Sequence, residues 1–474
     1  MKRFSTFTIL MMFVLHIQAQ LSITEATVVA AQDPWGNVRP RLALNSQNEP
    51  VVIWTNPGES DLYSAVKVDN AFTTPQKLNP DGMDISAFDW SGPEIAANDE
   101  KIVVVMKQKP EMEGHIYIVT SGDGGLTWSD TLRVDESSAY MTRMPSVAID
   151  FYNNIYVSYL RDNMEGYSDW AMSKLLDGAD AFVPAVSVSD NFTDAVCDCC
   201  PSATLVQGNT VVVLYRNNET NLRDIRASVS YDAGETFSLQ ADMDDTNWMV
   251  NICPSQAPSA YITGNQLRST WMSDATGDSR VYFSSYDLDS ESFGGSQLIM
   301  PDASNDLQKH PAIAGSMAEQ AVVYEVNATT QRDIFFAITA DGVPFDDTEP
   351  VNMTGEMAGN QQRPHIAYAN GVYHIVYTDQ GGHAVQYQTI QNANSVWEAA
   401  HESLMLFPNP ALERITLSGF LGNEKLEVVV RTATGQKVYE GNSLVIDVTM
   451  LQAGIYTVAA TSELYTTVAR FVKE

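Results

Sequence analysis

Five arginines stand where they could together hold an anionic ligand. Arg39, Arg143 and Arg363 shortly precede a recurring proline, and Arg161 and Arg216 follow apolar, strand-like runs. A guanidinium group binds carboxylate, sulfate or phosphate through two parallel hydrogen bonds. The chain has 27 basic against 59 acidic residues, so chance would not be expected to gather its basic side chains. The alternative is that these arginines pair with neighbouring carboxylates and only brace the fold.

Four cysteines offer a second group with chemical potential. Cys197, Cys199 and Cys200 lie within four residues, and Cys253 follows about fifty residues later. In an exported protein an even number of cysteines favours two disulfides, with three possible connectivities. A bond between Cys199 and Cys200, or a bound soft metal such as copper, is the alternative. We expect disulfides, no metal site and no cofactor.

A sequence repeat must position these residues. A proline, one further residue, an apolar residue and often alanine recur 52 to 57 residues apart, at Pro40, Pro93, Pro145, Pro201, Pro258, Pro311 and Pro364. Two more apolar runs, a turn and a short fourth run generally follow. Proline at the first residue of a strand costs no ladder hydrogen bond. Four strands per repeat of this length indicate a β-propeller.

The seventh repeat runs out of strands near Trp397. Residues 22–30 alternate in polarity, and we predict that they supply the missing outer strand and close a ring of seven blades, because closure removes exposed strand edges. In a propeller, the loops into each first strand and out of each second strand meet at one end of the channel, here called the mouth. The five arginines fall there, as do Lys107 and Lys309. The cysteine cluster and Cys253 lead into adjacent blades, so a disulfide between them would lock two mouth loops.

Two turns share the pattern Ser-x-Asp-x-Gly-x-Thr-aromatic, at residues 121–128 and 230–237, with degenerate copies at 177–182 and 341–345. The Asp ties up turn amides, Gly supplies a special backbone conformation, and the aromatic packs between sheets. The pattern resembles the Asp box of the sialidase superfamily, over residues of about 22 to 400. The resemblance implies an all-β fold with a β-propeller, for which six blades is the usual number in that family.

The resemblance also implies a set of catalytic roles. Sialidases hold the sugar carboxylate with three arginines and use a tyrosine paired with glutamate as nucleophile and an aspartate as acid/base. At the mouth, Tyr377 with Glu325 would be the nucleophile pair and Asp162 the acid/base, with Tyr215 and Asp89 as alternatives. Arg39 resembles an early Arg-x-Pro motif of the family, although the intervening residue is missing. Arg216 and Arg363 would complete the triad.

The N-terminus has the pattern of a secretory signal peptide, residues 1–20. Lys2 and Arg3 precede an apolar run over residues 7–17, and a plausible cleavage region follows at residues 18–20. The run is too short for a permanent membrane helix. We therefore expect export, no transmembrane segment, and a propeller over residues 21–400.

The C-terminus carries a second resemblance, over residues 403–474. It opens on Leu406-Phe407-Pro408-Asn409-Pro410 and closes on Arg470-Phe471-Val472-Lys473. These motifs resemble the type A sorting domain of the type IX secretion system. Alternating apolar residues predict a small β-sandwich. The resemblance implies that the tail serves as an export address and is removed after export. A generic carbohydrate-binding or immunoglobulin-like module is the alternative.

The net charge of −32 argues against nucleic-acid partners, and we expect a monomer. The leading functional hypothesis is a secreted, sialidase-like glycoside hydrolase that acts on an acidic sugar or polysaccharide. The second is a non-catalytic surface propeller that binds an anionic glycan or a protein, and the third is a structural exoprotein. Besides its ligand, the chain would contact the secretion machinery through its tail. A nucleophile and an acid within reach of the mouth arginines would distinguish the first hypothesis from the others.

Overall fold

In the residues that it describes, the computed structural model contains antiparallel β-sheets and two short 3-10 helices. It describes residues 21–31, 33, 36–135, 140–163, 168–189, 196–300, 306–328, 331–380, 383–392, 405–418, 427–432, 436–461 and 466–473. The predicted signal peptide lies outside these residues. Among the described residues, no helix combines the length and apolar character that crossing a membrane requires.

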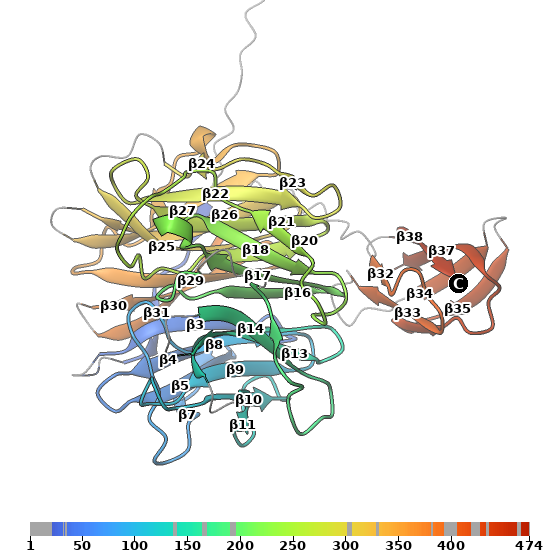
Figure 1. Ribbon diagram of the computed structural model, residues 1–474, viewed down its shortest axis with the longest axis horizontal. Coiled ribbons are helices and arrows are strands. Elements are labelled where there is room, and N and C mark those ends of the chain that lie inside the picture. The colour runs from blue at the N-terminus through green and yellow to red at the C-terminus, as the bar shows by residue number, and fades with distance from the viewer. Residues whose placement is uncertain are drawn as a thin grey trace, which may run out of the picture.

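Within the described residues, seven sheets of four or five strands precede the C-terminal region, and we call them blades 1 to 7 (Figure 1). Blade 1 contains β3 Val38–Leu44, β4 Pro50–Asn56, β5 Asp61–Val68, β6 Ala71–Phe72 and β7 Gln76–Lys77. Blade 2 contains β8 Glu94–Ala97, β9 Ile102–Lys107, β10 Ile116–Ser121 and β11 Leu132–Arg133. Blade 3 contains β12 Met141–Ile149, β13 Ile155–Asp162, β14 Ser168–Leu175 and β15 Val186–Ser187.

The later blades repeat this order of strands. Blade 4 contains β16 Ala203–Gln207, β17 Thr210–Arg216, β18 Ile225–Ser230 and β19 Leu239–Asp242, with the 3-10 helix Glu219–Asn221. Blade 5 contains β20 Ser259–Thr263, β21 Gln266–Ser273, β22 Arg280–Asp287, β23 Ser292–Phe293 and β24 Gln297–Leu298. Blade 6 contains β25 Leu307–Gly315, β26 Glu319–Asn327, β27 Arg332–Ala340 and β28 Val351–Asn352, with the 3-10 helix Phe345–Asp347.

Blade 7 is closed by the N-terminus of the chain. It contains β29 Gln361–Ala369, β30 Val372–Asp379 and β31 Ala384–Asn392, and both β1 Leu21–Ile23 and β2 Thr27–Ala30 pair with β31. The first strands of successive blades contact one another, and β29 contacts β3, so the blades form a closed ring. The predicted seven-bladed β-propeller and its N-terminal closing strand are therefore confirmed, and the usual six blades do not apply.

The second strand of each blade explains why the sequence shows long apolar runs. Strands β4 and β9 are buried along their whole length. A blade packs against a neighbour on each face, so a central strand buries the side chains of both faces instead of alternating with polar residues. These strands form the hydrophobic layers between the blades.

The two Asp-box turns lie between the third and fourth strands of blades 2 and 4. The carboxylate of Asp123 accepts hydrogen bonds from the backbone N–H of Thr127 at 2.9 Å and from the Ser121 hydroxyl at 2.8 Å. Asp232 accepts the corresponding bonds from Thr236 and Ser230, at 2.9 and 2.7 Å. These carboxylates are occupied by their own turns, which is the structural role that the sequence predicted.

The C-terminal region forms a small sandwich of two sheets. One contains β32 Met405–Phe407, β33 Arg414–Ser418 and β36 Val445–Asp447, and the other contains β34 Glu427–Thr432, β35 Lys437–Gly441, β37 Gly454–Thr461 and β38 Thr466–Lys473. It lies against the turn between β12 and β13, where the Tyr152 and Thr416 hydroxyls are 2.7 Å apart (Figure 1). That turn belongs to the end of the propeller opposite the mouth.

Candidate functional site

Four of the first strands are distorted at the mouth in the same way. The register of β3, β12, β25 and β29 shifts at a β-bulge just before the repeat proline. At this bulge, φ is positive for Arg39 (53°), Met144 (53°), His310 (51°) and Arg363 (56°). Residues other than glycine rarely adopt a positive φ. Bulges and strained residues of this kind are concentrated at positions where a side chain must be redirected for function.

Arg363 and Glu325 form the centre of the candidate site. The backbone N–H of Arg363 donates a 2.7 Å hydrogen bond to Glu325, and its Nη1 lies 3.7 Å from the same carboxylate. Burial raises the pKa of Glu325, although the Arg363 charge partly offsets this. Among the described residues, Nε and Nη1 of Arg363 and Oε2 of Glu325 make no hydrogen bond. This pair therefore retains unused hydrogen-bonding capacity.

Asp89 occupies the outer side of Arg363. Its carboxylate lies 3.3 Å from Nη2, and its side chain is 67% exposed. The Arg363 side chain is only 13% exposed, so the pair is exposed on the Asp89 side alone. Because that carboxylate stays in contact with water, displacing it from Arg363 costs little.

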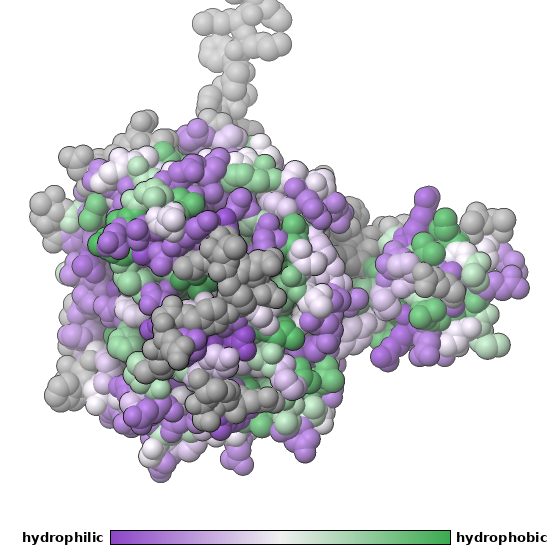
Figure 2. Space-filling view, in the orientation of Figure 1, coloured by the Kyte–Doolittle hydropathy of each residue, from purple (hydrophilic) through white to green (hydrophobic). Residues whose placement is uncertain are grey.

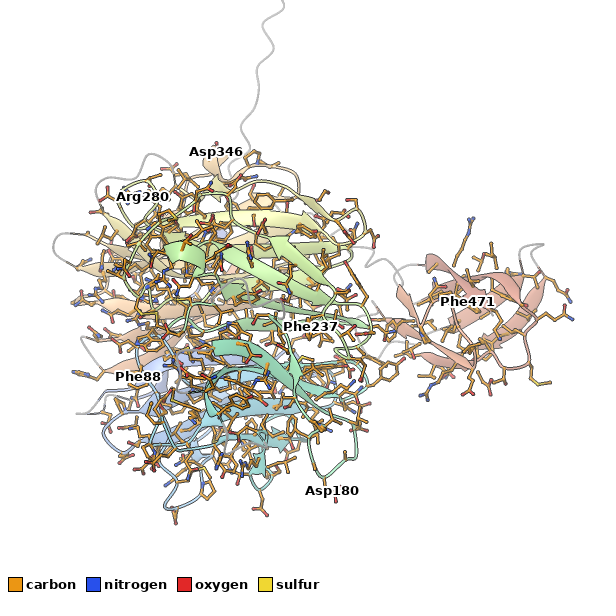
Figure 3. The ribbon with its side chains drawn as sticks, viewed as in Figure 1. Phe88, Asp180, Phe237, Arg280, Asp346 and Phe471 are labelled. Atoms are coloured by element: carbon orange, nitrogen blue, oxygen red, sulfur yellow. A yellow bond between two sulfur atoms is a disulfide. The ribbon has the colours of Figure 1, made fainter. Side chains whose placement is uncertain are left out.

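An aromatic pair flanks Asp89 in the loop that leads into blade 2. The rings of Phe88 and Trp90 stack with centroids 5.5 Å apart, and Phe88 is 44% exposed. Figure 3 places Phe88 on the opposite side of the propeller from Asp180, which belongs to a degenerate Asp-box turn. Our sequence analysis did not identify Phe88, although the alternation Phe88-Asp89-Trp90 before Pro93 was an available signal.

A second group of basic residues is braced across blades 1, 2 and 7. Arg39 and Arg41 both pair with Glu94, and Arg39 also donates to the Pro93 carbonyl at 2.6 Å. Burial, together with the Arg39 charge, lowers the pKa of Arg41 to about 9. Burial also lowers the pKa of His365, to about 3, so its imidazole is neutral. Arg39 is thus engaged in bracing.

The other predicted arginines differ in how far they are engaged. Arg161 makes a paired contact with Asp169, at 2.9 and 2.5 Å. Arg216 is fully buried, donates to the carbonyls of Arg223 (2.5 Å) and Met272 (2.8 Å), and lies over the ring of Trp248. Among the described residues, the ion pairs of Arg143 are long, 3.8 Å to Asp162 and 3.9 Å to Asp198. Bracing therefore accounts for Arg161 and Arg216, whereas Arg143 and Arg363 are more loosely held.

The tyrosines suggested as nucleophiles point away from the mouth. Tyr377 is fully buried in the hydrophobic cluster between blades 6 and 7, and its hydroxyl donates a 2.8 Å hydrogen bond to Gln388. Burial raises its pKa, which further disfavours the phenolate. The Tyr215 hydroxyl donates to Gln240 at 2.8 Å within blade 4. Tyr377 is thus not brought to Glu325 as the resemblance implied, and Asp162 is engaged with Arg143.

Blade 4 holds two buried carboxylates near the mouth that our sequence analysis did not single out as a pair. Asp224 accepts a 2.9 Å hydrogen bond from the backbone of Trp248, and Asp244 accepts one from Thr246 at 2.9 Å. Burial, followed by the Asp224 charge, raises the pKa of Asp244 to about 6. Within the described part of the chain, Oδ2 of Asp244 makes no hydrogen bond.

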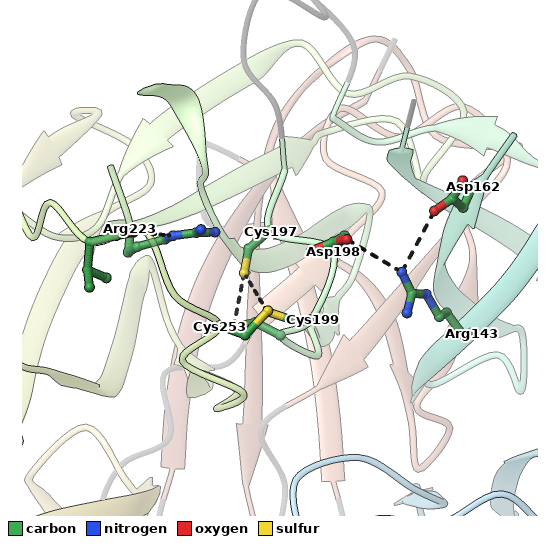
Figure 4. Close-up of a disulfide and its surroundings, with 9 residues drawn as sticks. Arg143, Asp162, Cys197, Asp198, Cys199, Arg223 and Cys253 are labelled. Atoms are coloured by element: carbon green, nitrogen blue, oxygen red, sulfur yellow. Dashed lines mark hydrogen bonds and ion pairs between the residues drawn. A yellow bond between two sulfur atoms is a disulfide. The ribbon is translucent and has the colours of Figure 1, made fainter. Parts of the chain in front are cut away.

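The cysteines lie at the mouth between blades 4 and 5 (Figure 4). A disulfide joins Cys199 to Cys253, so it locks two mouth loops as the repeat predicted. Cys197 and Cys200 are free and buried, with their sulfur atoms 3.1 Å apart. One disulfide is present where the even cysteine count favoured two. Three of the sulfur atoms, those of Cys197, Cys199 and Cys200, lie within 4.8 Å of one another.

The surface agrees with an exported protein. In Figure 2 the visible face of the propeller is mostly hydrophilic, with apolar residues scattered singly or in small groups. Parts of several mouth loops, including residues 136–139, 164–167, 190–195 and 301–305, lie outside the described residues.

Comparison with known families identifies the C-terminal region. Residues 405–474 match the secretion system C-terminal sorting domain. The chain therefore carries a type IX sorting domain and is a secreted or cell-surface protein, as its terminal motifs predicted. No curated protein matches the sequence.

Solved structures resemble the chain at low identity. An ulvan lyase, from a new family of polysaccharide lyases, is 12% identical, with 76% of this chain and 94% of that chain covered and a TM-score of 0.49. A sialidase of Trypanosoma rangeli is 10% identical, with coverage of 96% and 89% and a TM-score of 0.44. A Dyadobacter fermentans protein of unknown function is 11% identical, with coverage of 78% and 99% and a TM-score of 0.46. These likenesses concern the fold alone.

Proposed function

We propose that the mouth of this secreted propeller binds an anionic glycan, with Arg363 holding the anionic group. The observation that carries the proposal is the set of contacts around Arg363. Among the described residues, Nε and Nη1 of its guanidinium group make no hydrogen bond. The group lies beside the buried carboxyl of Glu325, and the displaceable carboxylate of Asp89 covers its outer side. A ligand carboxylate or sulfate would replace Asp89 and gain a charge-assisted hydrogen bond.

The aromatic pair supports a sugar as the carrier of that group. A pyranose ring has an apolar face, and an exposed aromatic ring offers it a flat, rigid surface at low cost in conformational entropy. Phe88 is exposed, and its stacking partner Trp90 packs against the hydrophobic cluster of blades 3 and 4. The sugar ring would lie on the ring of Phe88. Asp89, the next residue of the chain, contacts Arg363, so an acidic substituent of the sugar would take the place of Asp89 and bind Arg363.

Hydrolysis of the bound glycan is the second candidate function, and Glu325 is the observation that favours it. A buried carboxyl with a raised pKa is suited to donate a proton to a leaving glycosidic oxygen. Glu325 is in contact with the arginine that would hold the substrate. The tyrosines named above are held within blades, so we propose no tyrosine nucleophile.

The first experiment measures binding of the purified chain to immobilised polysaccharides. We expect retention on polymers that carry uronate or sulfate groups and none on neutral polymers of similar size. Arg363→Ala should abolish retention. Lys101→Ala is the matched control, because it removes the same charge from an ion pair with Asp177 at the opposite end of the propeller. Equal loss in both variants would show that only net charge matters and would refute a site at Arg363.

Catalysis is tested separately with the same ligands and with a fluorogenic sialoside. If the mouth hydrolyses a bound glycan, Glu325→Gln should lose turnover while keeping retention on the immobilised polymer. Retention without turnover in the unmodified protein would leave binding as the function and exclude the hydrolase for the substrates assayed.

A further inference from the structure

The cysteine cluster places a free thiol against an existing disulfide. The sulfur atom of Cys197 lies 3.5 Å from that of Cys199, which is bonded to Cys253, and 3.1 Å from that of Cys200. Cys197 and Cys199 are separated by one residue of the same loop, whereas Cys253 belongs to the loop that leads into blade 5 (Figure 4). The disulfide therefore links two blades, and the thiol beside it does not.

The surroundings favour the thiolate form of Cys197. A hydrogen bond joins Cys197 to Cys200, and this bond, with the backbone of Cys199 and the charges of Arg223 and Arg216, lowers the pKa of Cys197 to about 6. Burial raises the pKa of Cys200 well above its usual value, so Cys200 keeps its proton. Both guanidinium groups are buried, which also disfavours a metal cation at this position.

The loop that carries Cys253 is anchored on one side and held mainly by the disulfide on the other. The backbone N–H of Val250 donates to the carbonyl of Asn221 at 3.0 Å, and Nε of Arg223 donates to the carbonyl of Val250 at 3.2 Å. Beyond Val250, Ile252 is 60% exposed. The next side-chain contact along the chain is made by Gln256, which accepts a hydrogen bond from the backbone of His310 at 3.0 Å.

We propose that Cys197 exchanges with the Cys199–Cys253 disulfide and so releases the leading loop of blade 5 at the mouth. The Cys197 thiolate attacks Sγ of Cys199. A Cys197–Cys199 bond forms, the Cys199–Cys253 bond breaks, and Cys253 leaves as the thiolate. The Cys197 thiolate supplies the electron pair of the new bond, and the sulfur of Cys253 keeps the electron pair of the broken bond. The step therefore requires no oxidant, reductant or net proton transfer.

The exchange converts a link between two blades into a link within one loop. Residues between Val250 and Gln256 then lose the covalent tie that fixes them to blade 4. The reverse attack of Cys253 on Cys199 restores the tie. The mouth thus has two covalent states of equal composition. In one, the Cys199–Cys253 bond fixes the leading loop of blade 5, and in the other, with a Cys197–Cys199 bond, this loop is released.

The test is a peptide map of the full chain purified without reductant. The protein is held at pH 7.5, quenched in acid to protonate thiolates and stop exchange, denatured in acid, alkylated with N-ethylmaleimide and digested with trypsin. Residues 227–268 form one tryptic peptide, which holds Cys253, and residues 175–216 form another, which holds the other three cysteines. We expect the first peptide in two forms, linked to the second and free with alkylated Cys253.

The Cys197→Ser variant identifies the nucleophile. It should lose the free form and retain the linked one. The proposal is overturned if the unmodified protein gives only linked peptide, a result that requires no variant to fold. It is also overturned if the free form persists in Cys197→Ser, because another reductant would then have opened the bond.

Discussion

Because the pKa of Asp244 is raised, we predict that titration of this one carboxyl makes the free energy of unfolding depend on pH. Its carboxyl has a pKa of about 6, against 3.8 for an unperturbed aspartate, because it is buried and lies near Asp224. A carboxyl whose pKa is higher in the folded than in the unfolded chain stabilises the fold while it is protonated. This contribution is fully present below about pH 4 and is lost as the pH rises through about 6.

The magnitude follows from the shift. A shift of about two pKa units corresponds to about 3 kcal/mol, because each unit is worth about 1.4 kcal/mol. Asp244→Asn removes the titration. The new amide can retain the 2.9 Å bond from Thr246 on its oxygen and turn its N–H groups toward Asp224. We expect the variant to exceed the unmodified protein in unfolding free energy by up to about 3 kcal/mol at pH 8 and to match it near pH 4.

Urea denaturation at pH 4, 6 and 8 measures this difference. With a denaturant slope of about 3 kcal/mol per molar, the midpoint at pH 8 should rise by up to about 1 M. Asp242→Asn is the control, because Asp242 lies only two residues before Asp244, at the end of β19, but is 75% exposed and pairs with Arg226. A gap between Asp244→Asn and the unmodified protein that is independent of pH, or a less stable variant at pH 8, would refute the assignment of a buried, protonatable Asp244.

Three further predictions concern the ligand, the core and the closure of the ring. Asp89→Asn should tighten binding of an anionic glycan by up to about fivefold, because an ion pair whose carboxylate is exposed, worth up to about 1 kcal/mol, no longer competes; an unchanged affinity in calorimetry would contradict this. Trp271→Ala should lower the unfolding free energy by about 3–5 kcal/mol, since the side chain is fully buried between blades 4 and 5; a loss below about 1 kcal/mol would argue against this packing. Deleting residues 21–31 should expose the edge of β31 and produce oligomers in size-exclusion chromatography, whereas unchanged elution would show that β1 and β2 are dispensable.

Tyr377 shows that a position in the repeat does not determine the direction in which a side chain points. Tyr377 falls near the mouth end of β30, which is why its position in the repeat suggested chemistry. Along this strand Tyr373, Ile375 and Tyr377 face blade 6, while Val376 faces blade 1. Successive side chains of a strand point to opposite faces, and in a propeller both faces are covered by other blades. A residue can thus lie at the mouth end of a strand without facing the channel.

The arginines show a different limit. Their positions in the repeat identified the end of the propeller at which they gather, but not which of them are occupied. Arg161 is paired within its own blade, Arg216 donates to a carbonyl of the next blade, and Arg363 contacts carboxylates of two other blades. Arg363 and Glu325 are 38 residues apart in sequence and Arg216 and Met272 are 56 apart, so no local pattern reports these contacts.

The sequence by itself determined the seven repeats, the closing strand at the N-terminus, the Asp-box turns and the sorting domain. Each follows from local patterns of apolar residues, prolines and turn residues. The conformation that such a pattern favours depends on residues that are close in the sequence. Only the tertiary structure decided that Arg363 contacts Glu325 and Asp89, that Tyr377 belongs to the core, and that Cys199 bonds to Cys253 with Cys197 beside it. Those outcomes depend on bulges that redirect side chains and on contacts between blades, because the ring brings distant segments together only when it closes.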